Sequence, residues 1–352
     1  MTNATPLVQI ERAVKHFPVK SGGLFARTRE VVHAVDDVSL DIQAGETVGL
    51  VGETGCGKST LARCVTRLHT LTSGRVIFDG QDISTTTRRE LRPFRRRAQL
   101  VFQDPYGSLN PRRRVGAIIR DPFDIHGIGT PEERRTKVLE LMEIVGLNPE
   151  HYNRFPSEFS GGQRQRIGIA RAIALRPDLV VCDEPVAALD VSIRAQILNL
   201  LADLQTQFGM TYLFISHDLS VVRHVSDRVV VMYLGKIVEI APAADLYERA
   251  RHPYTAALLS AVPIADPDLA DAQSRVILSG DPPSPITPPS GCRFHPRCAF
   301  AQDRCRTEEP RLEGRAGDER GHTVACHYPI VFAAAPALPA SNAGATAERN
   351  VT

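Results

Sequence analysis

Residues 47–60 read TVGLVGETGCGKST, and their pattern indicates the type of fold. The first five residues form a compact apolar run, which is typical of a buried parallel strand. Gly52 to Ser59 fit the pattern G-x-x-x-x-G-K-[ST], and the residues after them have the apolar spacing of a helix. A strand, a glycine-rich turn and a helix in this order predict a loop whose backbone N–H groups and helix N-terminus bind phosphate.

A nucleotide with magnesium is the expected ligand of this loop. Lys58 would reach the β- and γ-phosphates, and the Ser59 hydroxyl would ligate the ion. Residues 179–184, LVVCDE, place two carboxylates at the end of an apolar strand, where open α/β sheets bind their ligands. We expect Asp183 to hold magnesium, directly or through water, and Glu184 to polarise the water that attacks the γ-phosphate. The predicted nucleotide-binding residues of the loop are Gly52, Glu53, Thr54, Gly55, Cys56, Gly57, Lys58, Ser59 and Thr60.

Alternation of strands and helices along the chain predicts an α/β domain with a mainly parallel sheet. Short apolar runs predict strands at 99–102, 179–182, 212–215 and 229–232, and a helix at 192–208. Two half-buried strands are expected from Leu7 and from Val38, with a long hairpin or loop over 18–35 between them. From about 104 to 176 apolar residues recur at helical intervals, so we expect an inserted helical subdomain there.

Composition limits the classes of protein to be considered. The 352 residues include 42 Lys plus Arg against 40 Asp plus Glu, for a net charge of +2, and 43% are hydrophobic. These values exclude disorder of the whole chain and give no overall electrostatic reason to expect nucleic acid or an anionic membrane surface as the main partner. No stretch approaches the roughly 18–20 consecutive apolar residues of a membrane-spanning helix, and the N-terminus lacks a secretory pattern. We therefore expect the chain to stay in the cytosol.

Further motifs make the sequence recognisable. Residues 159–166 read FSGGQRQR, which resembles the signature of ATP-binding cassette (ABC) ATPases, and the resemblance extends over about residues 5–330. It implies a P-loop ABC nucleotide-binding domain with a parallel sheet core, an antiparallel β subdomain and a helical subdomain. It also implies ATP and Mg²⁺ as ligands and ATP hydrolysis as the activity. On this resemblance, Phe17 stacks on adenine, Gln103 senses the γ-phosphate and helps to hold magnesium, and His217 hydrogen-bonds the γ-phosphate. The catalytic residues would be Glu184, His217 and Gln103.

The resemblance also implies that two cassettes bind ATP between them. Residues Ser160, Gly161, Gly162 and Gln163 precede or open a helix, and their donors would contact a γ-phosphate held by a second subunit. Asp190, in the sequence ALD, would lie in the loop that faces the same interface. The alternative that this chain binds ATP without hydrolysing it, as the silent member of a pair, is disfavoured. The sequence keeps the lysine, both carboxylates and the histidine of an active site.

Three longer segments narrow the resemblance to one group of importers. VFQDPYGSLNPR, HPYTAALLSAVPIADPDL and PPSGCRFHPRCAFAQDRC resemble the ATP-binding subunits of dipeptide, oligopeptide and nickel importers, and in particular the second of their two ATPases. This implies that the chain energises import of small peptides, with nickel chelates or another small solute as the alternative. The implied partners are a second, homologous ATPase chain, two transmembrane permease subunits and, indirectly, an extracytoplasmic solute-binding protein. The implied location is peripheral, on the cytoplasmic face of the bacterial inner membrane.

Cysteines divide the chain into two parts. Cys56, Cys64 and Cys182 are scattered, whereas four more follow a proline-rich linker at 280–291 with the spacing C-x5-C-x6-C-x20-C. In a reducing compartment such a group favours metal ligands over disulfides, and the spacing differs from that of zinc ribbons. The resemblance implies a [4Fe-4S] cluster held by Cys292, Cys298, Cys305 and Cys326. A zinc site that recruits His295, His322 or His327, and free thiols with a packing role, stay open.

The sequence therefore predicts an ATPase domain over 1–253, a cysteine-rich C-terminal region over 254–330 and a disordered tail over 331–352. One rival function is an ABC ATPase that acts on nucleic acid, since residues 88–97 contain six arginines. The low net charge, the single cassette and the lack of interleaved aromatic residues count against nucleic acid as a partner. Two interpretations of Cys56 stay open: a reactive thiol with a pKa lowered by the helix N-terminus, or a small loop residue, which we favour.

Overall fold

The computed structural model describes residues 5–19, 30–104, 107–262, 278, 280–314 and 321–332. Its larger sheet has the strand order β11-β12-β10-β9-β3-β8-β7-β6. The strands from β9 to β6 run parallel, with β3 between β8 and β9. Their bounds are β3 (Thr47–Val51), β6 (Ala98–Val101), β7 (Leu179–Asp183), β8 (Thr211–Ser216) and β9 (Arg228–Tyr233). The strands predicted from apolar runs are thus confirmed to within a residue or two at each end.

A second, antiparallel sheet lies beside the first, with the order β2-β1-β4-β5. It consists of β1 (Val8–Pro18), β2 (Val31–Ile42), β4 (Ser73–Phe78) and β5 (Gln81–Asp82). β1 and β2 pair along their full lengths, from Val8 opposite Ile42 to Pro18 opposite Val31. The expected segment 18–35 is therefore a hairpin whose second strand begins at Val31, and its tip lies outside the described residues. The antiparallel β subdomain is confirmed.

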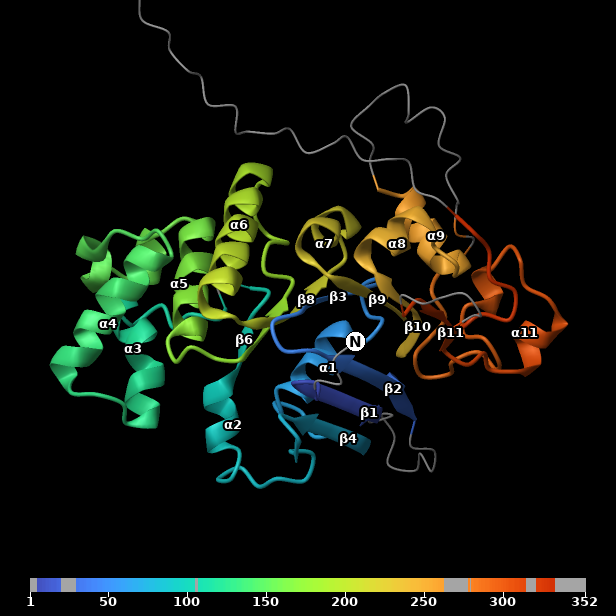
Figure 1. Ribbon diagram of the computed structural model, residues 1–352, viewed down its shortest axis with the longest axis horizontal. Helices are drawn as coiled ribbons and strands as arrows, with labels where there is room; N and C mark the ends of the chain where they lie inside the picture. Colours follow the sequence, from blue (N-terminus) through green and yellow to red (C-terminus); the bar gives the residue numbers. More distant parts are fainter. Residues whose placement is uncertain are drawn as a thin grey trace, which may run out of the picture.

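Helices fill the segment between β6 and β7 in the described part of the chain. They are α3 (Val115–His126), α4 (Pro131–Ile144), the 3₁₀ turns η1 (Pro149–Asn153) and η2 (Pro156–Glu158), and α5 (Gly161–Ile173). Figure 1 shows α3, α4 and α5 together at one side of the molecule. α4 begins with a capping box, in which the Thr130 hydroxyl accepts from the Glu133 N–H and the Glu133 carboxylate accepts from the Thr130 N–H.

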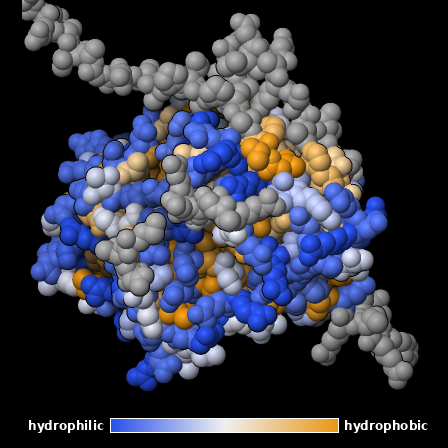
Figure 2. All heavy atoms as spheres, turned by 45° about the vertical axis from the view of Figure 1, so that its right-hand side comes forward, coloured by the Kyte–Doolittle hydropathy of each residue, from blue (hydrophilic) through white to orange (hydrophobic). Residues whose placement is uncertain are grey.

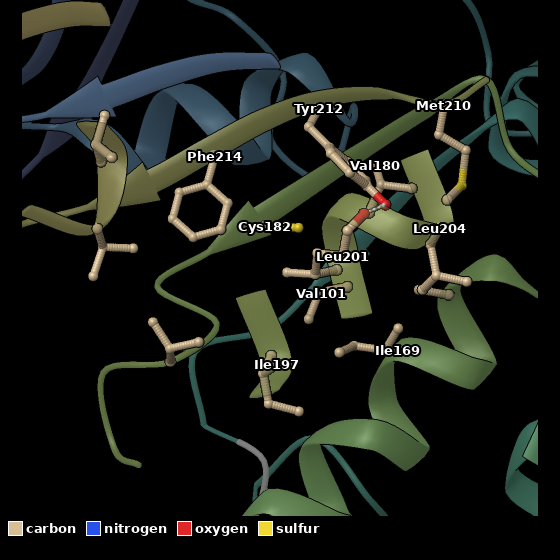
Figure 3. Close-up of a cluster of buried hydrophobic side chains, with 14 of the residues drawn as sticks. Val101, Ile169, Val180, Cys182, Ile197, Leu201, Leu204, Met210, Tyr212 and Phe214 are labelled. Atoms are coloured by element: carbon tan, nitrogen blue, oxygen red, sulfur yellow. Dashed lines mark hydrogen bonds between the residues drawn. The ribbon is translucent and has the colours of Figure 1, made fainter. Parts of the chain in front are cut away.

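A hydrophobic cluster joins these helices to the parallel sheet. The labelled side chains come from β6, β7 and β8, from α5, from α6 (Val191–Phe208) and from Met210 just before β8, and they gather in one cluster (Figure 3). Tyr212 is 3% exposed, and its hydroxyl donates to the carbonyl of Leu201 at 3.0 Å, so its polar end is satisfied within the core. The helix expected at 192–208 is confirmed as α6. A second cluster packs α1 (Lys58–Val65) between the two sheets.

The C-terminal region continues the larger sheet. β10 (Lys236–Pro242) pairs with β9 on one side and with β12 (Thr323–Val324) on the other, and β12 pairs with β11 (Glu313–Gly314). The helices α7 (Leu219–Val225), α8 (Ala243–Glu248), α9 (Pro253–Ser260) and α11 (Asp303–Thr307), with α2 (Arg92–Arg97) and the turn η3 (His295–Arg297), complete the described elements. The segment that carries the four clustered cysteines is therefore joined to the edge of the larger sheet (Figure 1).

The end of the described chain differs from the sequence prediction. Phe332 forms a bridge to Ala250, and its N–H donates to the Ala250 carbonyl at 2.9 Å. Phe332, the second residue of the tail predicted from 331, is thus held by backbone pairing. Residues 333–352 of that prediction lie outside the described residues.

Candidate nucleotide-binding site

The glycine-rich loop joins β3 to α1 in a conformation that only glycine fits at two points. Gly57 has φ of 110°, and a Cβ there would lie 2.0 Å from the carbonyl oxygen of Ala34. A Cβ on Gly52, with φ of 150°, would lie 2.1 Å from the carbonyl oxygen of Met232. Both positions therefore require a residue without a side chain, which keeps the loop tight against its neighbours.

Lys58 turns back over this loop. Its side chain is buried, and Nζ donates to the carbonyl oxygens of Gly52 at 2.7 Å and Glu53 at 3.0 Å. The ammonium group is thus held at the centre of the loop by neutral acceptors only. A phosphate that enters the loop would offer it a charged acceptor, and charge-assisted hydrogen bonds are stronger than neutral ones.

Ser59 and Asp183 face each other across the start of α1 and the end of β7. The Ser59 hydroxyl donates to Oδ1 of Asp183 at 2.8 Å, and Asp183 is only 3% exposed. Burial is the main cause that raises the pKa of Asp183, so a nearby cation would relieve an unfavourable charge. A hydroxyl and a buried carboxylate are hard oxygen donors, which fit Mg²⁺. Gln103, the third predicted ligand, contacts Glu184 instead.

The other two residues predicted to be catalytic, Gln103 and His217, both contact the carboxylate of Glu184. Gln103 Nε2 donates to Glu184 Oε2 at 2.9 Å, and His217 Nδ1 lies 3.3 Å from the same oxygen. Glu184 itself has a positive φ of 47°, and its N–H donates to the Ile215 carbonyl at 3.0 Å. Strained backbone at a non-glycine residue is common at functional sites, and here it aims the carboxylate at the edge of the parallel sheet.

The signature segment is ordered by its own hydrogen bonds. The Ser160 hydroxyl accepts from the Gln163 N–H at 3.3 Å, and the Ser160 N–H donates to Oε1 of Gln163 at 3.0 Å, which caps α5. A Cβ on Gly162 would lie 2.4 Å from Ile193. These bonds stay within the segment, and in the described chain none joins Ser160 or Gln163 to the phosphate loop. Asp190 is the N-cap residue of α6, and its carbonyl accepts a hydrogen bond from the backbone N–H of Arg194 at 2.8 Å.

Phe17 lies on β1 with its ring roughly perpendicular to the ring of His69, at a centroid distance of 5.5 Å, and Lys15 Nζ lies 4.9 Å from the Phe17 ring centre.

Cys56 is 5% exposed, and burial raises the pKa of its thiol. The interpretation of Cys56 as a reactive thiol with a lowered pKa is therefore wrong, because desolvation outweighs the nearby Lys58 charge.

Two residues from the C-terminal region hold the phosphate loop, and the sequence analysis missed both. Arg297 makes two hydrogen bonds to the carboxylate of Glu53, at 2.8 and 3.1 Å, and the side chain of Arg297 is 7% exposed. The Glu53 N–H donates to the hydroxyl of Tyr254 at 2.8 Å, and Tyr254 is fully buried. Arg297 lies between the first and second of the four clustered cysteines, so the cysteine-rich segment contacts the phosphate loop directly.

The four clustered cysteines line one small pocket. Cys292, Cys298, Cys305 and Cys326 share its wall with His295 and His327, whereas His322 instead contacts Glu239 at 2.7 Å. Burial raises the pKa of Cys292 to about 11 and that of Cys326 to about 12. Four tetrahedral sulfur ligands of one zinc ion lie about 3.8 Å apart. Within the described residues, no three of these sulfurs lie within 4.8 Å of one another.

The arginine-rich segment at 88–97 takes part in structural contacts. Arg97 pairs with Asp79 at 2.8 Å and with Asp178 at 2.5 Å, and Arg92 donates to the Ile125 carbonyl at 2.8 Å. These contacts tie α2 to the surrounding loops. Two of the six arginines therefore have structural partners within the protein and need no role in binding nucleic acid.

In the part of the chain that the structure describes, every helix is too short or too polar to span a membrane. The face in Figure 2 is mostly hydrophilic, with apolar residues in separate groups. Singly exposed apolar residues are normal on a folded protein.

Comparisons with known proteins agree with this geometry. The family model described as ABC transporter matches residues 35–187, and the model described as the C-terminal region of oligopeptide/dipeptide transporters matches residues 238–305. A probable peptide ABC transporter ATP-binding protein of Sinorhizobium fredii is 51% identical over 98% of this chain and 96% of its own length. An oligopeptide transport ATP-binding protein, AppF of Bacillus subtilis, is 51% identical over 92% of this chain and 98% of its own length.

Solved structures show the same cassette. The dimeric, post-hydrolysis ATP-binding cassette MJ0796, bound to ADP and Pi, has a TM-score of 0.60 and 30% identity, covering 67% of this chain and 98% of that one. CbiO1 of Clostridium perfringens, part of an ABC transporter complex, has a TM-score of 0.59 and 26% identity, covering 69% of this chain and 91% of that one.

Proposed function

This chain belongs to the family of peptide ABC transporter ATP-binding proteins, and from that premise we propose that its ATP hydrolysis energises import of dipeptides and oligopeptides. The observation that carries the ATPase assignment is the arrangement of Ser59, Asp183 and Glu184 at one edge of the sheet. The match to the oligopeptide/dipeptide transporter C-terminal model supports the peptide cargo.

Each catalytic group has a role that follows from its contacts. Lys58 would exchange its two carbonyl acceptors for phosphate oxygens, and Ser59 and Asp183 would hold Mg²⁺, which neutralises charge on the phosphates. Glu184 would accept a proton from the attacking water. Gln103 and His217 both contact Oε2 of Glu184, so they would orient its carboxylate and position the water.

The active unit would be a pair of cassettes. The signature residues Ser160, Gly161, Gly162 and Gln163 are capped among themselves, and their N–H groups open α5. A second cassette that faced this helix end would supply the γ-phosphate that these donors suit. The dimeric MJ0796 cassette supports this arrangement. We propose that the partner is a homologous ATPase chain, with Asp190 at the interface.

The transporter would include two permease subunits, with the cassettes on the cytoplasmic face of the bacterial inner membrane and a solute-binding protein outside. We propose that residues 104–176, which insert between β6 and β7, dock on the permeases. Gln103 lies immediately before this insertion, so contact with a permease there would reach Glu184 through one hydrogen bond.

We further propose that the four-cysteine pocket holds a [4Fe-4S] cluster. The sulfurs line one cavity but are spaced more widely than the ligands of a single zinc ion, which favours a larger group over zinc. Anaerobic purification with iron, sulfide and zinc analysis tests this. We expect iron and sulfide in the wild type and in Cys64→Ala, which changes a buried cysteine elsewhere, and their loss in Cys305→Ala. Zinc alone, or no metal, would contradict the cluster.

Purification of the complex from mildly solubilised membranes tests the function. We expect two permeases and a second ATPase by mass spectrometry, and ATPase activity stimulated by a binding protein loaded with peptide. If only a binding protein loaded with a nickel chelate stimulated the ATPase activity, the transporter assignment would stand, but the cargo would be the nickel chelate and not a peptide. Recovery of ribosomes or DNA-repair proteins without a permease would contradict the transport role.

A further inference from the structure

Two histidines and an aspartate meet near the loop end of the paired strands β1 and β2, where the N–H of His33 donates to the carbonyl of Pro285 in the C-terminal region. His16 and His33 are paired residues on β1 and β2, and their ring centroids are 4.2 Å apart. Asp36, three residues after His33, places one carboxylate oxygen 3.4 Å from His16 Nε2 and the other 3.6 Å from His33 Nδ1. In the described part of the chain, these three residues form the only group of three or more metal-ligating side chains with ligand atoms within 4.8 Å.

The two ring nitrogens that face Asp36 lack a hydrogen-bond partner. His16 Nε2 and His33 Nδ1 are inaccessible to solvent, and neither makes a hydrogen bond. Most buried polar atoms are hydrogen-bonded, so a pair of unsatisfied nitrogens aimed at one carboxylate needs an explanation. A metal ion is one group that would satisfy both nitrogens at once.

The separations match those around a small divalent ion. Two ligands at about 2.0–2.1 Å from a tetrahedral zinc ion lie about 3.3–3.4 Å apart. The two carboxylate to imidazole distances, 3.4 and 3.6 Å, are within a few tenths of an ångström of that value. The side chains of His16, His33 and Asp36 are 20–25% exposed, so the group lies near the surface although its two ligand nitrogens face inward.

Asp36 is already fixed by its neighbours. Its N–H donates to the Gly235 carbonyl at 2.9 Å, and Arg293 forms an ion pair with Oδ2. Arg293 also donates to the Leu234 carbonyl at 2.6 Å, so its guanidinium group stays in place. Oδ1 faces His16 and remains the oxygen best placed for an ion, with Arg293 as the outer partner that orients the carboxylate.

We propose that His16, His33 and Asp36 form a binding site for a divalent transition-metal ion of the zinc, cobalt or nickel type. Two imidazoles and one carboxylate suit these ions, whereas Mg²⁺ and Ca²⁺ prefer oxygen ligands alone. The site differs from the nucleotide site and the four-cysteine pocket, and it does not depend on the proposed cargo. Ion binding here would join the paired strands β1 and β2, at the residue next to Phe17, to the segment that carries Arg293.

Cobalt titration of the metal-free, full-length chain tests this site and separates it from the cysteines. Co²⁺ bound by imidazole and carboxylate gives visible d–d bands, whereas cysteine ligation adds intense thiolate charge-transfer bands at shorter wavelength. We expect one equivalent of Co²⁺ with d–d bands alone, displaced by Zn²⁺. His33→Gln and His16→Gln each remove an ion ligand, so each should weaken affinity by more than the roughly 10–100-fold that loss of an outer partner costs.

The matched control is His224→Gln, which changes an exposed histidine on α7 and should bind Co²⁺ as the wild type does. Thermal unfolding without metal checks that each variant is folded, and added Zn²⁺ should raise the Tm of the wild type but not of a folded His33→Gln or His16→Gln. Absence of cobalt bands from the wild type, thiolate bands alone, or unchanged affinity in both histidine variants would overturn the proposal.

Discussion

Arg297 and Glu53 form a two-point ion pair that joins the cysteine-rich segment to the phosphate loop, with N–O distances of 2.8 and 3.1 Å. The residues are 244 positions apart in the chain. Tyr254 adds a second contact, since its hydroxyl accepts from the Glu53 N–H. The backbone of the loop is therefore held on one side by its own strand and helix and on the other by the C-terminal region.

The first prediction concerns this ion pair. Arg297→Ala removes both hydrogen bonds and leaves the Glu53 carboxylate, 26% exposed, without its cation. Hydrogen bonds to charged groups contribute about 1.5–3 kcal/mol, so we expect ATP affinity to fall by up to roughly 10–150-fold as the loop loosens. Calorimetric titration with ATP measures this. Arg306→Ala, an exposed arginine of the same segment, should bind ATP normally, and equal affinities in both variants would contradict the coupling.

The second prediction concerns the buried carboxylate of Asp183. Its pKa is raised, chiefly by burial, so its contribution to stability is present below the ordinary value of 3.8 and is lost as pH rises through the raised pKa. At neutral pH the charge is therefore unfavourable in the nucleotide-free chain. We expect Asp183→Asn to stabilise that chain by roughly 0.5–2 kcal/mol and to abolish Mg²⁺-dependent ATPase activity.

Urea unfolding across pH separates the two effects. The stability difference between Asp183→Asn and the wild type should shrink in acid, where the wild-type carboxyl is protonated. Asp203→Asn changes an exposed carboxylate of α6, so as a control it should show no gain. A variant that is less stable than the wild type at neutral pH would show that Asp183 is needed for folding.

The parallel sheet could be predicted because its strands are short, uninterrupted apolar runs. The run 229–232 corresponds to β9 and 212–215 to β8, each within one residue of the structure at either end. β10 escaped prediction, because Glu239 interrupts its apolar pattern. That carboxylate is fully buried and accepts from the N–H groups of Arg251 and His252. The sequence around Glu239 alone cannot show that its hydrogen-bond donors lie about a dozen residues further along the chain.

The candidate site was predictable where its residues stand in contiguous motifs. Lys58 and Ser59 follow one strand and Asp183 ends another, and parallel strands bring such ends together. Arg297 and Tyr254 belong to no such motif of phosphate binding, and they contact Glu53 from η3 and α9, about 200 or more residues further along the chain. Only the tertiary structure reveals that the two regions touch.

The third prediction tests the base. Glu184→Gln keeps the size of the side chain and can still contact Gln103, but it cannot accept a proton. General-base catalysis contributes about 10²–10⁴-fold, so we expect ATPase activity of the assembled complex to fall by at least 100-fold while ATP binding persists. Single-turnover phosphate release measures the loss, with Glu140→Gln in α4 as control. Near-normal turnover would mean that another group, or the partner cassette, performs the chemistry.

The last prediction concerns acid stability. His252 is 1% exposed, its Nδ1 accepts from the Tyr254 N–H at 3.1 Å, and burial lowers its pKa from 6.5 to about 4. A lowered histidine pKa gives stability that is present above 6.5 and is lost as pH falls toward 4, because the unfolded chain takes up the proton first. The full contribution is about 3 kcal/mol.

His252→Asn keeps an acceptor at the start of α9 but removes the titration. We expect the variant to be less stable than the wild type at pH 7, by about 1–3 kcal/mol, because an amide replaces a packed imidazole. Between pH 6.5 and 4 its free energy of unfolding, measured by urea denaturation, should fall less steeply than that of the wild type. His224→Asn should keep the wild-type slope, since His224 is exposed. If His252→Asn lost stability with the same slope, the acid sensitivity would arise from other groups. A flatter slope would assign it to this buried imidazole, which lies beside Tyr254 and hence beside the phosphate loop.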